Sequence, residues 1–267
     1  MLYSCASLDT LDPSLAHYLH SEIPQSAHYN EQTHCFHYTK DGGRPVQCGG
    51  IHSLLRERFY SHHQSNRSQR DHARVGVVGS NAKQGQLIDA QLDLAVEGKK
   101  PEGRKKWHRM TLELLKFWKS KNHTLQATQV PVELAGGWSR MTKADVITKG
   151  PDGKLWLWEI KTGYPIGFYR SQKNFASAPF LDVPCTHENI WFLQLHYTHQ
   201  ALHTNAGIRI EGGARVLQVY EKKGPKKGDK RLVVEERIPP AWLTSRVPLW
   251  VQPLGVPVPL NKKRKQE

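Results

Sequence analysis

"KADVITKGPDGKLWLWEIKTG" (residues 143–163) has the pattern of two strands joined by a tight turn. The central "GPDG" supplies the turn residues of a β-hairpin, and apolar residues dominate the second arm. Glu159 and Lys161 stand two residues apart near the end of that arm, so a strand projects both side chains from one face. The hairpin brings Asp145 of the first arm towards them. We therefore expect two carboxylates and one amine to converge at one end of a sheet.

Such a cluster can be a structural ion pair or part of a metal-binding catalytic site. An ion pair at an exposed strand end would contribute only about 0 to 1 kcal/mol to stability. Two carboxylates held close together repel each other unless a cation lies between them. Hard oxygen ligands of this kind suit Mg²⁺ or Mn²⁺, and a neighbouring lysine can orient a water or help to deprotonate it.

The remaining chain predicts helices before this hairpin and one helix and further strands after it. Apolar residues recur at helical spacing in one group of segments and alternate, or cluster, as strands do in another. We predict helices over 84–98, 107–118 and 189–202, and strands over 125–134, 214–220 and 231–237. This order predicts an α/β fold in which a mixed central β-sheet is flanked by helices.

Proline, glycine and charge patterns divide the chain into three parts. Residues 1–75 are expected to form a basic, largely irregular N-terminal extension, and residues 76–240 the α/β domain, with a long loop over 163–188. Residues 241–267 are rich in proline and end in "NKKRKQE", which predicts a disordered basic tail.

The composition favours a polyanionic partner. The formal net charge is +14 at pH 7, which favours nucleic acid first and an anionic membrane second. No stretch is as long and apolar as a membrane span, the start has no signal-peptide pattern, and the four cysteines suggest no disulfide framework. We therefore expect an intracellular protein without a membrane partner. The terminal "KKRK" is compatible with nuclear import, and a viral or phage product is equally compatible.

Asp145, followed after a hairpin by Glu159-Ile160-Lys161, resembles the metal motif of the PD-(D/E)xK nuclease superfamily. Two flanking helices extend the likeness to its RecB-type, lambda-exonuclease-like branch. "GQLIDAQLD" (85–93) is similar to the branch's first motif, with Asp89 where that branch often has His and Asp93 where it often has Glu. "LQLHYTHQAL" (193–202) resembles its glutamine helix, although the tyrosine follows the glutamine by three residues, where four is usual.

The resemblance implies a restriction-endonuclease-like core and a role for each matching residue. Asp145 and Glu159 would bind Mg²⁺ or Mn²⁺ through their carboxylates, and Ile160 through its main-chain carbonyl. Lys161 would position the attacking water. Gln194 would support the lysine, the DNA backbone or the metal-bound water. The acid on the first helix would be either Asp93 or Asp89.

The activity implied is metal-dependent hydrolysis of DNA phosphodiester bonds by an exonuclease or a recombination or repair nuclease. The expected partner is DNA, double-stranded or with single-stranded ends. Two other functions stay open: a catalytically inactive nucleic-acid-binding protein of the same fold, and an RNA-directed nuclease. The sequence leaves the oligomeric state undetermined.

Overall fold

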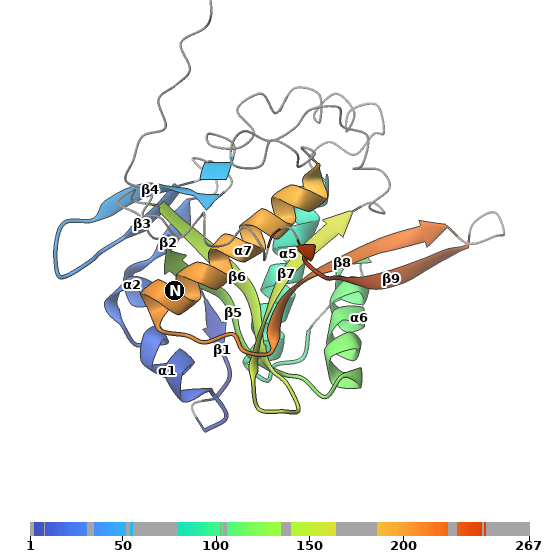
Figure 1. Cartoon of the computed structure of the whole chain (residues 1–267). Coiled ribbons are helices and arrows are strands. Elements are labelled where there is room, and N and C mark those ends of the chain that lie inside the picture. Colours follow the sequence, from blue (N-terminus) through green and yellow to red (C-terminus); the bar gives the residue numbers. More distant parts are fainter. Residues whose placement is uncertain are drawn as a thin grey trace, which may run out of the picture.

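The structure is a computed structural model of the whole chain (Figure 1). It describes residues 3–7, 9–30, 35–51, 54–55, 80–101, 103, 106–134, 140–163, 186–223, 229–241 and 243. The predicted loop over 163–188 and the predicted tail over 241–267 lie almost wholly outside these residues.

The strands of the described part form one nine-stranded mixed sheet. Its main path runs in the order β2 (His28–Asn30), β3 (Cys35–Tyr38), β4 (Val46–Gly50), β6 (Arg140–Lys149), β7 (Leu155–Gly163), β8 (Gly213–Lys223) and β9 (Lys230–Arg237). On its other edge β6 pairs with β5 (Thr124–Glu133), which in turn pairs with β1 (Ser4–Cys5). The β4–β6 and β7–β8 pairs are parallel, and all others are antiparallel.

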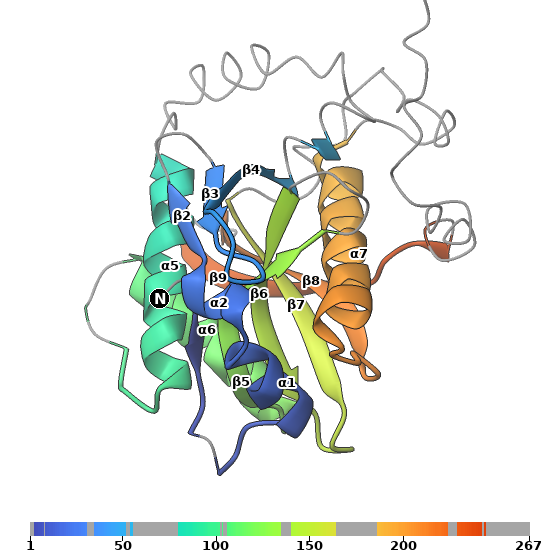
Figure 2. The same cartoon turned by 90° about the vertical axis from the view of Figure 1, so that its left-hand side faces the viewer.

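Helices lie on both faces of this sheet (Figures 1 and 2). On one face, α5 (Ser80–Val96) and α6 (Lys106–Ser120) bury Ile88, Leu92, Met110, Leu114 and Trp118 against the sheet. The other face carries α7 (His187–Ala206) and the short helices α1 (Pro13–Leu19) and α2 (Glu22–Ser26). The predicted α/β fold with a mixed sheet flanked by helices is therefore confirmed.

The local prediction and the structure differ most in the first 51 residues, which we expected to be largely irregular. The described part of this segment carries four strands and two helices, and the strands belong to the same sheet as the rest. Each of these strands has only two to five residues. β2, β3 and β4 pair with one another in chain order and β1 pairs with the distant β5, but each of these strands is too short to show the alternation that identifies a strand.

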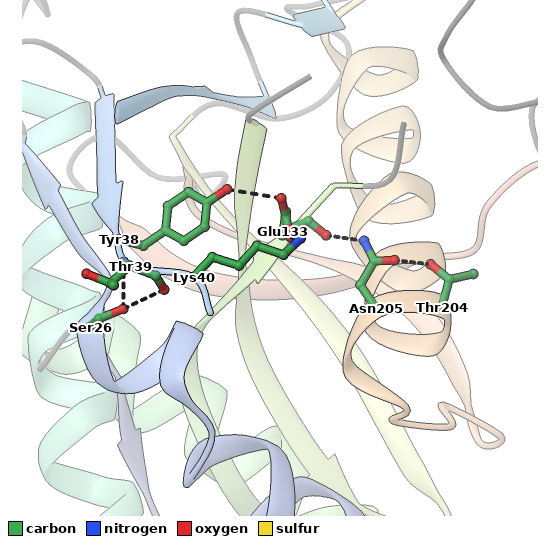
Figure 3. A network of polar contacts seen from close by, with 7 residues as sticks. All are labelled: Ser26, Tyr38, Thr39, Lys40, Glu133, Thr204 and Asn205. Atoms are coloured by element: carbon green, nitrogen blue, oxygen red, sulfur yellow. Dashed lines mark hydrogen bonds and ion pairs between the residues drawn. The ribbon is translucent and has the colours of Figure 1, made fainter. Parts of the chain in front are cut away.

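Glu133 at the end of β5 joins this N-terminal part to the core and to α7 (Figure 3). Its carboxylate accepts hydrogen bonds from the Tyr38 hydroxyl at 3.0 Å and the Lys40 ammonium at 2.7 Å. Its main-chain carbonyl accepts one from the Asn205 side chain at 2.6 Å. One residue thus connects β3, β5 and α7, so residues 35–51 are a built-in part of the fold.

Candidate active site

The site lies at a fork where β7 leaves β6. The antiparallel pairing of these strands runs from Lys149 opposite Leu155 to Val146 opposite Trp158. On the same edge of β6, the parallel pairing with β4 covers only Arg140 and Met141. The stretch of β6 that contains Asp145 lies between these two pairings, so its edge faces the gap where the strands diverge.

Asp145 fills part of that gap. Its Oδ2 accepts a hydrogen bond from the main-chain N–H of Ile160 at 2.9 Å. Because that N–H points along the plane of the sheet, the carboxylate stands where a strand carbonyl would otherwise be. The carbonyl of a strand residue points to the same edge as its own N–H, so the Ile160 carbonyl faces Asp145 as well.

An irregularity in β6 aims Asp145 in this direction. Ala144 and Ile147 both pack in the core on the α7 side, whereas Val146 packs against α5 and α6. Strict alternation would place residues 144 and 146 on one face, so the strand rotates between them. On β5, Gln129 lies opposite this point and has a φ of 54°. Local distortions of this kind commonly re-aim a side chain next to a functional site.

Glu159, Lys161 and Gln194 form a closed cluster beside Asp145. The Lys161 ammonium donates to Glu159 Oε1 at 2.5 Å and to Gln194 Oε1 at 3.3 Å. The Gln194 amide donates to Glu159 Oε1 at 2.5 Å. The side chain of Glu159 is 1% exposed and that of Lys161 16%. The structure therefore brings together the predicted ion pair of β7 and the predicted glutamine of α7.

The second oxygen of Glu159 is unused in this cluster. Within the described residues, the buried Oε2 has no hydrogen-bond partner. Burial, and then the nearby charge of Asp145, raises the pKa of Glu159 to about 8, although Lys161 acts in the opposite direction. A buried carboxylate oxygen with no donor is costly, and either a proton or a cation would relieve that cost.

The two helix acids of α5 lie in different surroundings. Burial, and then the charge of Asp145, raises the pKa of Asp89 to about 7. Asp93, one turn further along, accepts a hydrogen bond from the Thr128 hydroxyl of β5 at 2.6 Å. Burial raises the pKa of Asp93, and this hydrogen bond opposes the shift. Asp89 is therefore the helix acid that interacts with the fork, while Asp93 is held by β5.

Lys161 is placed to act as a cation. Burial lowers its pKa, but the carboxylates of Glu159 and Asp145 raise it, and the net shift is upward. The amine therefore stays protonated at neutral pH. A protonated Lys161 can orient a water or a phosphate oxygen by donating hydrogen bonds, whereas it cannot accept a proton in this state.

Two residues that the sequence analysis did not select also border the site. The charge of Lys143 lowers the pKa of both Asp89 and Asp93, and its ammonium lies 5.3 Å from the ring centre of Tyr29. In the sequence, the signal that could have indicated Lys143 is its position two residues before Asp145. Gln218 of β8 is buried and lies in register with Lys161. No local pattern indicates it, because the pairing of β7 with β8 spans more than fifty residues.

Gly85 and Tyr197, which lie in the two flanking segments that resemble the nuclease branch, pack within the fold. Gly85 of α5 faces β7, where a Cβ added to it would lie 3.9 Å from the Thr162 hydroxyl. Tyr197 of α7 is buried in the hydrophobic core on that side of the sheet.

The fork offers two carboxylates, those of Asp145 and Glu159, as ligands for a divalent cation. No three His, Cys, Asp or Glu side chains within the described part of the chain group closely enough to hold a metal ion by themselves. Mg²⁺, however, is commonly held by one or two carboxylates, with water and substrate phosphate completing its octahedron. Asp145, the unused oxygen of Glu159 and the Ile160 carbonyl match that donor set.

We compared the chain with protein-family models and with curated proteins. No protein-family model matches the chain, and no curated protein matches it significantly. In the described residues, no helix is long and apolar enough to cross a membrane.

Proposed function

We propose that this protein is a metal-dependent nuclease that hydrolyses DNA phosphodiester bonds, as an exonuclease or a recombination or repair nuclease. The observation that carries the proposal is the cluster of Glu159, Lys161 and Gln194 next to Asp145. These residues follow the order of the PD-(D/E)xK motif and its glutamine helix, and they meet at one fork of the sheet. The charge of +14 supports a polyanionic substrate.

Each residue has a defined task in this proposal. Asp145, Glu159 and the Ile160 carbonyl hold Mg²⁺ or Mn²⁺, with Asp89 as a neighbouring negative charge. The bound cation supplies charge neutralisation at the phosphoryl group and acidifies water. Glu159 would have to lose its proton for this role, because a carboxylate must be ionised to bind a metal.

Lys161 and Gln194 act on water and phosphate. The Lys161 ammonium donates hydrogen bonds that hold the attacking water in line with the scissile bond. Gln194 keeps this ammonium in place through its side-chain oxygen, and it fixes the rotamer of Glu159 through its amide. Precise placement of the reactants is itself a large part of catalysis.

The test is cleavage of matched linear DNA, circular DNA and RNA with Mg²⁺, Mn²⁺ or EDTA. The proposal expects metal-dependent cutting of DNA, restricted to the linear form for an exonuclease. Asp145→Asn should remove the activity, with the fold retained by circular dichroism. If no form of DNA is cut with either metal, the proposal is wrong, and cutting of RNA alone would identify an RNA-directed nuclease.

A nucleic-acid-binding protein without catalysis is the second candidate. It is favoured by the observation that Lys161 and Gln194 already occupy Glu159 Oε1 and that no third ligand side chain joins Asp145 and Glu159 in the described residues. This candidate predicts binding of DNA that is indifferent to Mg²⁺, with no cleavage at any metal concentration.

A further inference from the structure

The β8–β9 hairpin extends beyond the rest of the sheet at the end that holds the site. Gly163, the last residue of β7, pairs with Tyr220 of β8. The antiparallel pairing of β8 with β9 continues for three more pairs, to Lys223 opposite Lys230. Figure 1 shows this part of the hairpin reaching out from the body of the molecule.

This extended part is strongly basic. Residues 221–231 contain six Lys and Arg against two acidic residues. The side chains of Lys222, Lys230 and Arg231 are exposed, that of Lys230 by 62%. Glu221 pairs with Lys106 of α6 at 3.2 Å and lies only loosely, at 3.9 Å, from Lys230. Among the described residues of the hairpin, Lys222 and Arg231 have no ion pair, so these two cations can meet an outside anion.

The strand register places these charges near the candidate site. β8 runs parallel to β7, and Lys161 is in register with Gln218. Lys222 lies four residues further along β8, which is roughly 13 Å at the rise of a strand. One strand of duplex DNA carries a phosphate per 3.4 Å of rise, so this spacing corresponds to roughly four base pairs.

The surface chemistry favours a phosphate backbone over an apolar partner. Among the described residues, the exposed large hydrophobic side chain is that of Ile238, which is 67% exposed and lies after β9. In the extended pairs of the hairpin, the apolar Leu232 packs against the core, so the exposed groups there are cations and give no apolar anchor for a protein groove or a lipid core.

We infer that the β8–β9 hairpin contacts the phosphate backbone of duplex DNA a few base pairs from the bond at the site. This inference rests on the proposed function for its substrate. Lys222 and Arg231 lie opposite each other on the two strands, on the face of the sheet that also carries Lys161. Each meets a phosphate, and their contacts hold the duplex in register without reading its sequence.

The test measures binding of a 30-base-pair duplex in EDTA between 50 and 200 mM salt. The hairpin variant carries K222Q and R231Q, and the matched control carries K116Q and K154Q, which remove two exposed lysines elsewhere. Removing two phosphate contacts should make the slope of log K against log salt less steep by about 1.8, whereas the control should keep the wild-type slope. Thermal unfolding checks that both variants fold, and the single variant K222Q should make the slope less steep by about 0.9.

The outcomes separate this inference from the proposed function. Equal slopes for the hairpin and control variants overturn the inference, even if wild type cleaves DNA. A slope that depends on the hairpin supports the inference, even if wild type never cleaves. If the hairpin variant loses binding to anionic vesicles and keeps its binding to the duplex, the basic surface serves a membrane and the inference is wrong.

Discussion

Glu159 links the stability of the protein to pH, because it is a carboxyl group buried beside a second acid. Its pKa rises from 4.5 to about 8, and that of Asp89 rises from 3.8 to about 7. Between the ordinary pKa of each carboxyl group and its raised pKa in the folded protein, the folded protein keeps a proton that the unfolded chain has released. Without a cation, stability therefore falls as pH increases from about 5 to 8, since the folded state binds more protons than the unfolded state.

This linkage predicts that a divalent cation stabilises the protein more at pH 8 than at pH 6, because protons compete for the same oxygens. At a free Mg²⁺ or Mn²⁺ concentration of about 100 Kd, the stabilisation should reach about 2.7 kcal/mol at pH 8. Thermal unfolding with and without the metal at the two pH values measures it.

Asp145→Asn is the matched variant for this measurement. It removes the charge that adds to the effect of burial in raising both pKa values, while an amide oxygen can still accept the Ile160 N–H. The metal effect should disappear, and the fall of stability with pH should become shallower. Asp152→Asn, in the exposed turn between β6 and β7, should behave as wild type. An equal metal effect at both pH values, or one that survives in Asp145→Asn, would contradict the metal site.

Gln194 hydrogen-bonds both Lys161 and Glu159, so the proposed nuclease would depend on Gln194 to hold these two groups in place. Gln194→Ala should lower cleavage by about 10- to 100-fold, the range typical for groups that orient metal ligands. Gln200→Ala on the same helix is the control and should cut at the wild-type rate. Single-turnover cleavage at saturating DNA measures the effect. A wild-type rate in Gln194→Ala would remove this residue from the site.

At the scale of elements, the position of α5 against β7 determines which acid reaches the fork. Gly85 lies in the helix with room for a methyl group beside Thr162, so Gly85→Ala should raise stability by up to about 1 kcal/mol through helix propensity. In Gly212→Ala, by contrast, the new methyl group would overlap the indole of Trp156, and we expect a loss of about 1 to 3 kcal/mol. Urea unfolding of the two variants tests both signs, and a destabilised Gly85→Ala would mean that α5 packs more closely than described.

The elements that the sequence predicts well are those with their own pattern. The hairpin of residues 143–163, the strands after α7 and the helices α5, α6 and α7 follow from turn residues and apolar periodicity, and the structure confirms them. The short strands β1 to β4 have no such pattern. The choice between Asp89 and Asp93 could not be predicted either, because both lie on one face of α5 and only Thr128 of a distant strand separates their roles.

At the scale of the whole molecule, the charge of +14 should make DNA binding depend strongly on salt. Each phosphate contact releases counterions, so affinity should fall by about 10³ or more between 50 and 200 mM salt if six or more contacts form. Titration of a labelled duplex in EDTA measures this. A flat response would contradict binding dominated by phosphate contacts.

The measurement that tests the central claim most directly is cleavage of one linear duplex with Mg²⁺ by wild type, Lys161→Ala and Lys154→Ala. Lys154 is exposed in the turn at the opposite end of β7, so its loss should leave the rate unchanged. We predict that Lys161→Ala binds the duplex as wild type does but cuts it at least about 100-fold more slowly. Cutting by Lys161→Ala at the wild-type rate, or no cutting by wild type with Mg²⁺ or Mn²⁺, would contradict the proposed nuclease.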